Sequence, residues 1–231
     1  MKTDQSPPET IVDKLLTKEL PRRNFLRYTG ATLAASTLFA CKKDNDDMPS
    51  TGIDLGSGDI GILNYAYALE QLEAAFYTKV IQTPYASMPA TELALLTDIR
   101  DHEIAHREFF KAALGTSAIP ALEVNFSSIN FNDRTSVLAT AKTFEDLGVS
   151  AYNGAGKLIA DANYLLLAGK IVSVEARHAA AIRDLISNGT FADSTVIDMN
   201  GLDMANSPAV VLNAAAPFLV TALNGSNLPT S

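Results

Sequence analysis

The feature that most constrains the fold is a Glu-x-x-His motif that occurs twice in a chain with three histidines, at Glu103–His106 and Glu175–His178. Each motif lies in an amphipathic stretch, and residues three apart on a helix project from the same face. Another glutamate, Glu70 or Glu145, lies 33 or 30 residues earlier at a core position of its own helical stretch. The sequence therefore predicts helices that bring four carboxylates and two imidazoles together.

Four long helices are predicted from the spacing of apolar residues. Their ends follow from helix-capping residues, with Asp59 as the expected N-cap of the first helix, and from glycines that stop helices. The expected helices cover residues 59–81, 91–115, 133–159 and 163–188.

A repeat in the sequence indicates that a helical hairpin is duplicated. The first and third helices share a tyrosine seven residues after the glutamate, Tyr77 after Glu70 and Tyr152 after Glu145. The second and fourth helices share the Glu-x-x-His motif. The two tyrosines have three open roles: hydrogen bonding to the site, carrying an electron, or packing in the core.

The connections between the helices predict the topology. The loops after the first and third helices are short, so each pair forms an antiparallel hairpin. Residues 116–132 can run the length of a helix of about 36 Å in extended conformation and return the chain to the other end. The predicted fold is all-α, a four-helix bundle over residues 59–189 with one long crossover. Residues 190–231 are expected to pack on it, with a short helix from Pro208 to about Ala216.

The six candidate ligands lie on stripes that are otherwise apolar. Four uncompensated carboxylates would cost several kcal/mol each in such a place, on the order expected for buried ions, or would bind protons. Two divalent cations would balance their charge. Carboxylates and imidazoles without a thiolate favour iron or manganese. The predicted metal ligands are Glu70, Glu103, His106, Glu145, Glu175 and His178.

Two further polar residues lie beside these candidates. Glu73, one turn from Glu70, is predicted to be a solvated surface residue, and the alternatives are a seventh ligand or a carboxylate on an access path. His102 precedes Glu103 and points about 100° away from it on a helix. It is therefore predicted to lie on the surface.

The N-terminal segment has the organisation of an export signal. A charged region containing Arg22 and Arg23 precedes an apolar stretch of 13 residues, 28–40. As a helix this stretch would reach about 20 Å, too short for a bilayer core of about 30 Å. Residues 1–40 are therefore predicted to be a signal peptide, and the polar residues 41–58 a flexible tether.

Two features of this segment resemble known signals. The twin arginine followed by Phe25 and Leu26 resembles a twin-arginine export signal. The run Leu38-Phe39-Ala40-Cys41 resembles a bacterial lipobox, which implies a lipid on Cys41, the only cysteine. The alternative is a plain signal peptide with an incidental cysteine. The lipoprotein interpretation implies a membrane-anchored protein of the cell envelope, on its periplasmic or surface face.

The composition excludes some classes of partner. The formal net charge is −8, whereas a protein that binds nucleic acid needs a basic surface to neutralise phosphates. A single cysteine excludes an intramolecular disulfide framework. The oligomeric state stays open, a homodimer included.

Taken together, residues 59–189 resemble the ferritin-like bundle of rubrerythrins, and the segment 152–178 is similar to the ferritin-like proteins associated with bacterial desiccation. The resemblance implies that Glu70 and Glu145 are terminal ligands of a dinuclear Fe or Mn centre, and that Glu103 and Glu175 bridge the two ions. His106 and His178 would each give one nitrogen ligand to one ion.

The resemblance also implies a choice of function. Members of this family oxidise Fe(II), reduce peroxide or, with manganese, dismutate it, so the expected substrates are peroxide, dioxygen or Fe(II). The chain has no Cys-x-x-Cys pair for a rubredoxin-like iron site. The alternative is a non-catalytic stress-associated scaffold of the envelope whose metal site is structural or lost.

Overall fold

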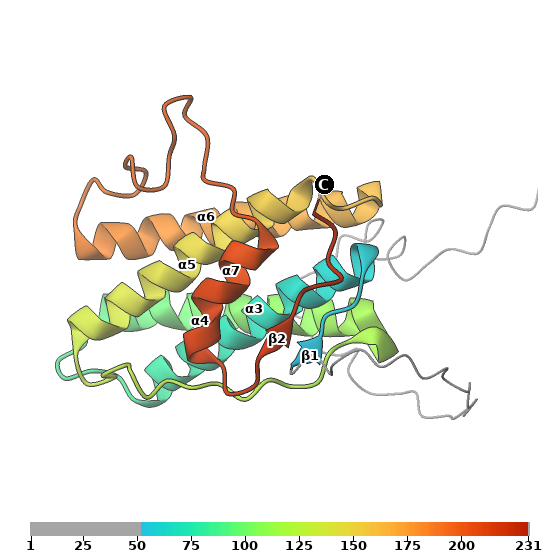
Figure 1. The fold of residues 1–231 in the computed structure, drawn as a ribbon. Coiled ribbons are helices and arrows are strands. Elements are labelled where there is room, and N and C mark those ends of the chain that lie inside the picture. The colour runs from blue at the N-terminus through green and yellow to red at the C-terminus, as the bar shows by residue number, and fades with distance from the viewer. Residues whose placement is uncertain (1–51, 231) are drawn as a thin grey trace, which may run out of the picture. The chain divides into compact units, whose positions relative to one another are not determined.

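A computed structural model describes residues 52–230. The predicted signal peptide, Cys41 and the tether as far as residue 51 lie outside these residues. Four long helices form the described bundle (Figure 1): α3 (Gly58–Gln82), α4 (Ala90–Leu114), α5 (Arg134–Gly156) and α6 (Ala162–Ile186). Helix α3 packs mainly on α4, and α5 on α6. The predicted all-α bundle is confirmed, and within residues 52–230 no helix has both the length and the apolarity to cross a bilayer.

The helix ends are set by local capping. Asp133 precedes α5, and its carboxylate accepts hydrogen bonds from the backbone N–H groups of Thr135 and Ser136 at 3.3 and 3.0 Å. Helix α4 ends at Leu114, and its C-cap is Gly115, whose φ of +54° favours glycine. Helix α5 ends at Gly156, three residues earlier than predicted, because the chain tightens into a turn in which Leu158 N–H donates to the carbonyl of Ala155.

Asp59 does not cap α3 as predicted, because Ser57 is the N-cap and Asp59 lies in the first turn. Its carboxylate instead accepts hydrogen bonds from the backbone N–H groups of Ala160 and Asp161, at 2.8 and 2.9 Å. A residue predicted to act locally therefore joins the start of α3 to the connection between α5 and α6.

The long crossover between α4 and α5 runs along the bundle from one end to the other (Figure 1). It begins with the 3-10 turn η1 (Gly115–Ser117). Two buried amides of α3 hold it. Asn64 donates to the carbonyl of Ser117 at 3.0 Å, and Gln71 accepts from Leu122 N–H at 2.9 Å. These contacts satisfy backbone groups that would otherwise be buried without partners.

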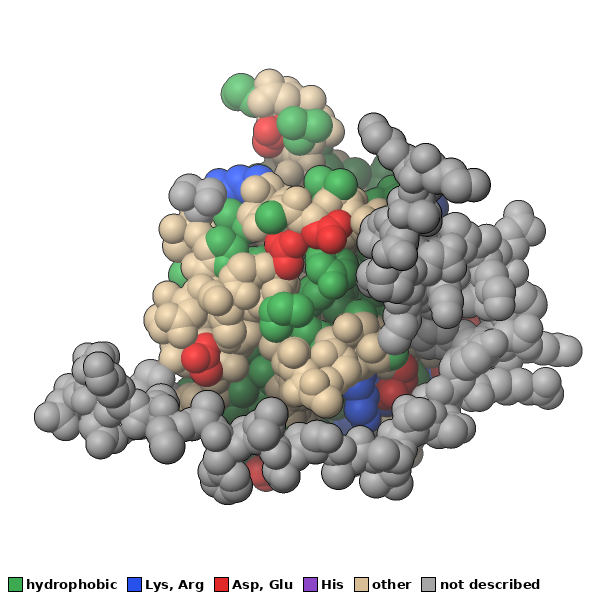
Figure 2. Space-filling view, turned by 90° about the vertical axis from the view of Figure 1, so that its right-hand side faces the viewer, with side chains coloured by type: hydrophobic (Ala, Val, Ile, Leu, Met, Phe, Trp, Pro, Cys, Tyr) green, Lys and Arg blue, Asp and Glu red, His purple; other side chains and the backbone are tan. Residues whose placement is uncertain are grey.

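The C-terminal segment packs on the bundle through α7 (Pro208–Ala215) and the 3-10 turn η2 (Ala216–Phe218). Helix α7 contacts α5 and buries Val211 and Ala215. The ring of Phe218 meets that of Phe144 edge to face, with centroids 4.7 Å apart. The segment between α6 and α7 rises away from the bundle in both views (Figures 1 and 2) and exposes Met199 at 98 %.

The predicted tether is wrong over its last seven residues, 52–58. Strand β1 (Ile53–Asp54) pairs in parallel with β2 (Leu223–Asn224), and Leu55 is completely buried. The polar composition of this stretch favoured a flexible segment. Its partner strand lies about 170 residues later, a pairing distance too long for local sequence patterns to reveal.

Candidate metal centre

The bundle brings all six predicted ligands together. They form two groups of four whose ligand atoms lie within 4.8 Å of one another. One group contains Glu70 and His106, and the other contains Glu145 and His178. Glu103 and Glu175 belong to both groups. Each of the four long helices therefore supplies at least one carboxylate, and each shared carboxylate faces both histidines.

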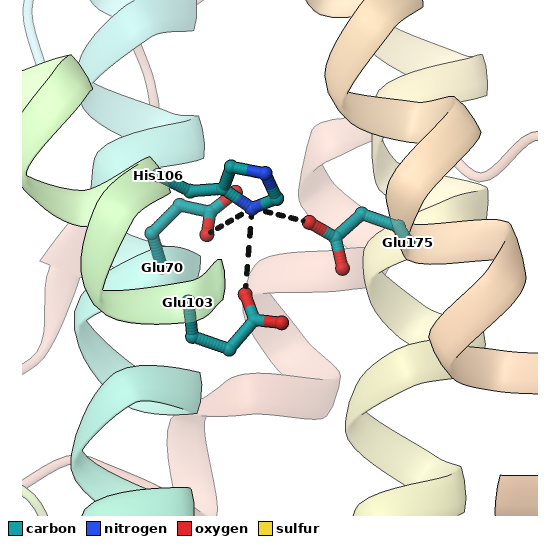
Figure 3. A group of neighbouring side chains, drawn as sticks. All are labelled: Glu70, Glu103, His106 and Glu175. Carbon is teal, nitrogen blue, oxygen red and sulfur yellow. Dashed lines mark ion pairs between the residues drawn. The ribbon is translucent and has the colours of Figure 1, made fainter. Parts of the chain in front are cut away.

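The first group is centred on Nδ1 of His106 (Figure 3). This nitrogen lies 2.8 Å from Glu175 Oε1, 3.4 Å from Glu70 Oε2 and 3.6 Å from Glu103 Oε2. The three carboxylates approach it from α3, α4 and α6. The His106 side chain is 13 % exposed, so this group lies nearer the surface than the second.

The second group is centred on Nδ1 of His178. It lies 2.8 Å from Glu103 Oε1, 3.3 Å from Glu175 Oε2 and 3.5 Å from Glu145 Oε2. The two histidines thus face the shared carboxylates in the same way. This repetition is the structural counterpart of the duplicated hairpin.

Burial and mutual repulsion dominate the electrostatics. The four glutamates are completely buried. Burial raises the pKa of Glu145 to about 7, and burial and the Glu175 carboxylate raise that of Glu103. Burial alone would also raise the pKa of Glu175, but the two imidazoles outweigh it and hold this pKa at about 2.

The imidazoles respond in the opposite direction. Burial alone would lower the pKa of His178, yet Glu103, Glu145 and Glu175 raise it to about 12. The pKa of His106 is raised as well, against its burial, by Glu70, Glu103 and Glu175. Without metal, both rings are therefore cationic at neutral pH and supply positive charge that balances part of the charge of the carboxylates.

The donor set is one that could hold metal ions, and most of its buried atoms have no hydrogen-bond partner. Within residues 52–230, seven buried side-chain atoms have no hydrogen-bond partner, and six of them belong to the site. Carboxylate oxygens lie 2.8–3.6 Å from His106 Nδ1, yet this nitrogen forms no hydrogen bond with them. Each such atom costs about 1–3 kcal/mol if left unpaired. The six are Glu70 Oε2, Glu103 Oε1 and Oε2, His106 Nδ1, Glu145 Oε2 and Glu175 Oε1.

Comparison with known proteins decides the family. A family model described as a ferritin-like domain matches residues 58–188, which is more than half of the chain. The chain belongs to the ferritin-like domain family. The matched residues run from the start of α3 to just beyond α6. No curated protein matches the chain significantly.

The structure shows two of the roles expected for the repeated tyrosines, since both rings are buried in the core and both hydroxyl groups form hydrogen bonds to the site. Tyr77 of α3 donates a hydrogen bond to Glu145 of α5 at 2.5 Å, and Tyr152 of α5 donates one to Glu70 of α3. Glu70 and Glu145 each belong to one group only and are called the outer carboxylates here. Each hairpin therefore supplies the hydroxyl group that orients the outer carboxylate of the other hairpin. The repeated Glu-x6-Tyr spacing in the sequence therefore corresponds to two reciprocal hydrogen bonds between the hairpins.

Glu73 is not a surface residue as predicted, because it is only 4 % exposed. Its carboxylate lies against Gly148 of α5, where an added Cβ would come within 3.1 Å of Glu73 Oε1. Burial raises its pKa well above the usual value, and the Glu103, Glu175, Glu70 and Glu145 carboxylates raise it further. The signal for this residue was its spacing of three from Glu70, which places both on one face.

His102 is exposed, as predicted, but it is not independent of the site. Its Nδ1 lies 2.9 Å from Nε2 of His178, on the side of that ring away from the carboxylates. The prediction considered only the angle between His102 and Glu103 along α4. It therefore missed the contact with α6, although His102 lies four residues before His106 and so near the same face.

Proposed function

We propose that this ferritin-like protein binds two Fe or Mn ions and uses them to oxidise Fe(II) or to reduce peroxide or dioxygen. The observation that carries the proposal is the pair of four-ligand groups that share Glu103 and Glu175 inside the bundle. A pair of redox-active cations, when bound, supplies the two electrons that an oxygen–oxygen bond takes up. Glu70 with His106 and Glu145 with His178 would hold one ion each.

The chain's own residues perform the other tasks of such a centre. The buried Tyr77 and Tyr152 orient the carboxylates of Glu145 and Glu70 through hydrogen bonds. Glu73 offers a carboxyl group beside the ligands, and its burial favours the protonated form, so it can hold a proton. Its position on α3, one turn from Glu70, suits a residue that gives this proton to reduced oxygen.

A small apolar cavity supports dioxygen as an oxidant. It has a volume of about 30 Å³ and lies between all four long helices, with Leu69, Phe110 and Tyr152 in its wall. Roughly 15 Å³ suffices for one water molecule, so this space fits a diatomic molecule. Tyr152 also donates a hydrogen bond to Glu70, so one side chain contacts both the cavity and a proposed metal ligand.

The test is metal analysis of the full chain followed by turnover. After anaerobic loading with Fe(II) or Mn(II), we expect about two ions per chain, and Glu103→Ala should lose both because that residue serves both groups. Glu123→Ala, at an exposed glutamate of the crossover, is the matched control. Oxygen or peroxide consumption by the loaded chain supports the enzyme. Two ions without turnover instead favour the non-catalytic scaffold with a structural site. No bound metal rejects the metal centre and favours the scaffold whose site is lost.

We further propose that the protein belongs to the rubrerythrin and desiccation-related type and is exported through the twin-arginine route with a lipid on Cys41. The support is the sequence around Arg22–Arg23 and the run Leu38–Cys41. In bacterial cells, Cys41→Ser should abolish incorporation of labelled fatty acid and move the protein from the membrane to the soluble fraction. Equal labelling of both versions would reject the anchor.

A further inference from the structure

The two imidazole ligands of the proposed centre differ in the contacts of the ring nitrogen that faces away from the carboxylates. Nε2 of His178, on the side away from the carboxylates, lies 2.9 Å from Nδ1 of His102. The two rings are nearly parallel, with an interplanar angle of 12° and centroids 5.1 Å apart. His102 comes from α4 and His178 from α6, so this contact joins two helices across the site.

The direction of this hydrogen bond follows from the chemistry of a ligand histidine. Nδ1 of His178 is the atom that faces Glu103, Glu145 and Glu175. A nitrogen that binds a metal ion carries no proton, so the proton of the neutral ring must lie on Nε2. Nε2 of His178 therefore donates, and Nδ1 of His102 accepts. The remaining proton of His102 then lies on its own Nε2.

His106 has no equivalent partner. Its Nδ1 faces the carboxylates, and no residue in the range 52–230 forms a hydrogen bond with its Nε2. The two groups of ligands are close to symmetric, but only the His178 ring has a hydrogen-bonding partner on the side away from the carboxylates. A hydrogen bond of this kind fixes the ring orientation and the proton position, and it makes the ligand nitrogen a better electron donor.

We propose that His102 is a positioning residue that makes the metal position at His178 bind its ion more tightly than the position at His106. The inference rests on the proposed metal centre and adds an order of loading to it. The first ion enters at His178 with Glu145, and the second at His106 with Glu70. Because His102 is exposed, its imidazole also connects the first position to the surface of α4.

The first measurement is calorimetric titration of the metal-free full chain with Mn(II). The wild type should show two binding steps. His102→Leu should weaken the tighter step by about 10–100-fold, the usual effect of removing such a partner, and change the weaker step little. His102→Gln, whose side-chain oxygen can accept the same hydrogen bond, should recover most of the loss. Ser173→Ala, at an exposed neutral position of α6, should leave both steps unchanged.

The second measurement observes the hydrogen bond itself. With the chain labelled with ¹⁵N in histidine and loaded with Zn(II), which has no redox chemistry, a scalar coupling should connect Nε2 of His178 to Nδ1 of His102. A purely steric contact gives no such coupling. Thermal unfolding of each variant shows whether any loss of affinity comes from a weakened fold.

The outcomes separate this inference from the proposed function. Unchanged titration of His102→Leu, or equal weakening of both steps, overturns the role of His102 while the metal centre stands. Failure of His102→Gln to recover affinity also overturns it. A wild-type chain that binds no metal overturns the proposed function, and the inference with it.

Discussion

Glu73 lies on α3, one turn after Glu70. It is a fifth buried carboxyl group beside the four ligands, and Gly148 leaves the space that it occupies. An alanine at that position would require the carboxylate to move, because a contact of 3.1 Å is tighter than usual. A glycine in the middle of a helix lowers stability by about 1 kcal/mol relative to alanine. At Gly148 the missing side chain leaves room for the Glu73 carboxylate.

Replacing Glu73 by glutamine should stabilise the metal-free protein at high pH. The pKa of Glu73 is raised in the folded chain, so the folded state holds this proton more strongly than the unfolded state. The corresponding stability is present below the unfolded value and is lost as pH rises through the folded one. Glu73→Gln should therefore raise the melting temperature by about 2–4 °C at pH 9, the effect of roughly 1 kcal/mol, and hardly change it at pH 5.

Thermal unfolding followed by circular dichroism at both pH values tests this expectation. Glu123→Gln, at an exposed glutamate, is the control and should change neither value. An equal effect of Glu73→Gln at pH 5 and pH 9 would show that the carboxyl group does not titrate in this range.

At the residue scale, sequence spacing was sufficient to predict that the six side chains of the site meet inside the bundle, but not what surrounds them. The Glu-x-x-His repeat placed Glu103, His106, Glu175 and His178 correctly on inward faces because side-chain direction follows helix geometry. The burial of Glu73 depends on a glycine of α5, and the contact of His102 depends on a ring of α6. Both depend on how the helices approach one another, which periodicity within one helix does not contain.

At the scale of elements, a buried arginine joins three parts of the chain. Arg183 of α6 is 3 % exposed and donates two hydrogen bonds of 2.7 Å to Asp146 of α5. Its guanidinium also donates to the carbonyl of Thr190 and to the hydroxyl of Thr195. The pKa of Arg183 is raised chiefly by Asp146. This pair thus fixes the α5–α6 hairpin and the start of the segment that follows it.

Replacing Asp146 should lower the free energy of unfolding more than replacing Arg183. Asp146→Ala leaves a buried guanidinium without its main partner, which costs about 3 kcal/mol. Arg183→Met leaves Asp146, which is 20 % exposed and can be hydrated, so the loss should be about 1–2 kcal/mol. Urea unfolding of both variants measures the difference. Lys170→Ala, at an exposed position of the same helix, is the control, and a larger loss for Arg183→Met would contradict the argument.

The elements were also the level at which the sequence was most informative. Glycine and aspartate signals placed the end of α4 at Gly115 and the start of α5 at Asp133, each within one residue, because caps act through the nearest backbone groups. The ordering of residues 52–58 was missed, since strand β1 exists only where β2 lies beside it.

At the scale of the whole molecule, the metal-free bundle holds protons where metal ions are proposed. The pKa values of His106 and His178 are raised by the surrounding carboxylates, to about 12 for His178. Both rings are then doubly protonated at pH 7. A metal ion needs the unprotonated nitrogen, so binding must displace these protons.

Loading the site at pH 7 should therefore release at least about two protons per chain, one from each imidazole. Calorimetry in two buffers with different ionisation enthalpies gives the number directly. His178→Gln should reduce it by about one, whereas Ser173→Ala should not change it. Release of no protons by the wild type would mean that the imidazoles are neutral before the ions enter.

The exchange of hydroxyl groups between Tyr77 and Tyr152 has a consequence for how such a molecule is assembled. Neither helical hairpin can form the site alone. Each lacks the tyrosine hydroxyl that donates to its own outer carboxylate, and each contains only part of the ligand set. An ancestor with a single hairpin would have had to pair with a second copy of itself to gain any of these contacts. Severing the crossover should accordingly yield two fragments that are inert alone and regain metal uptake when mixed.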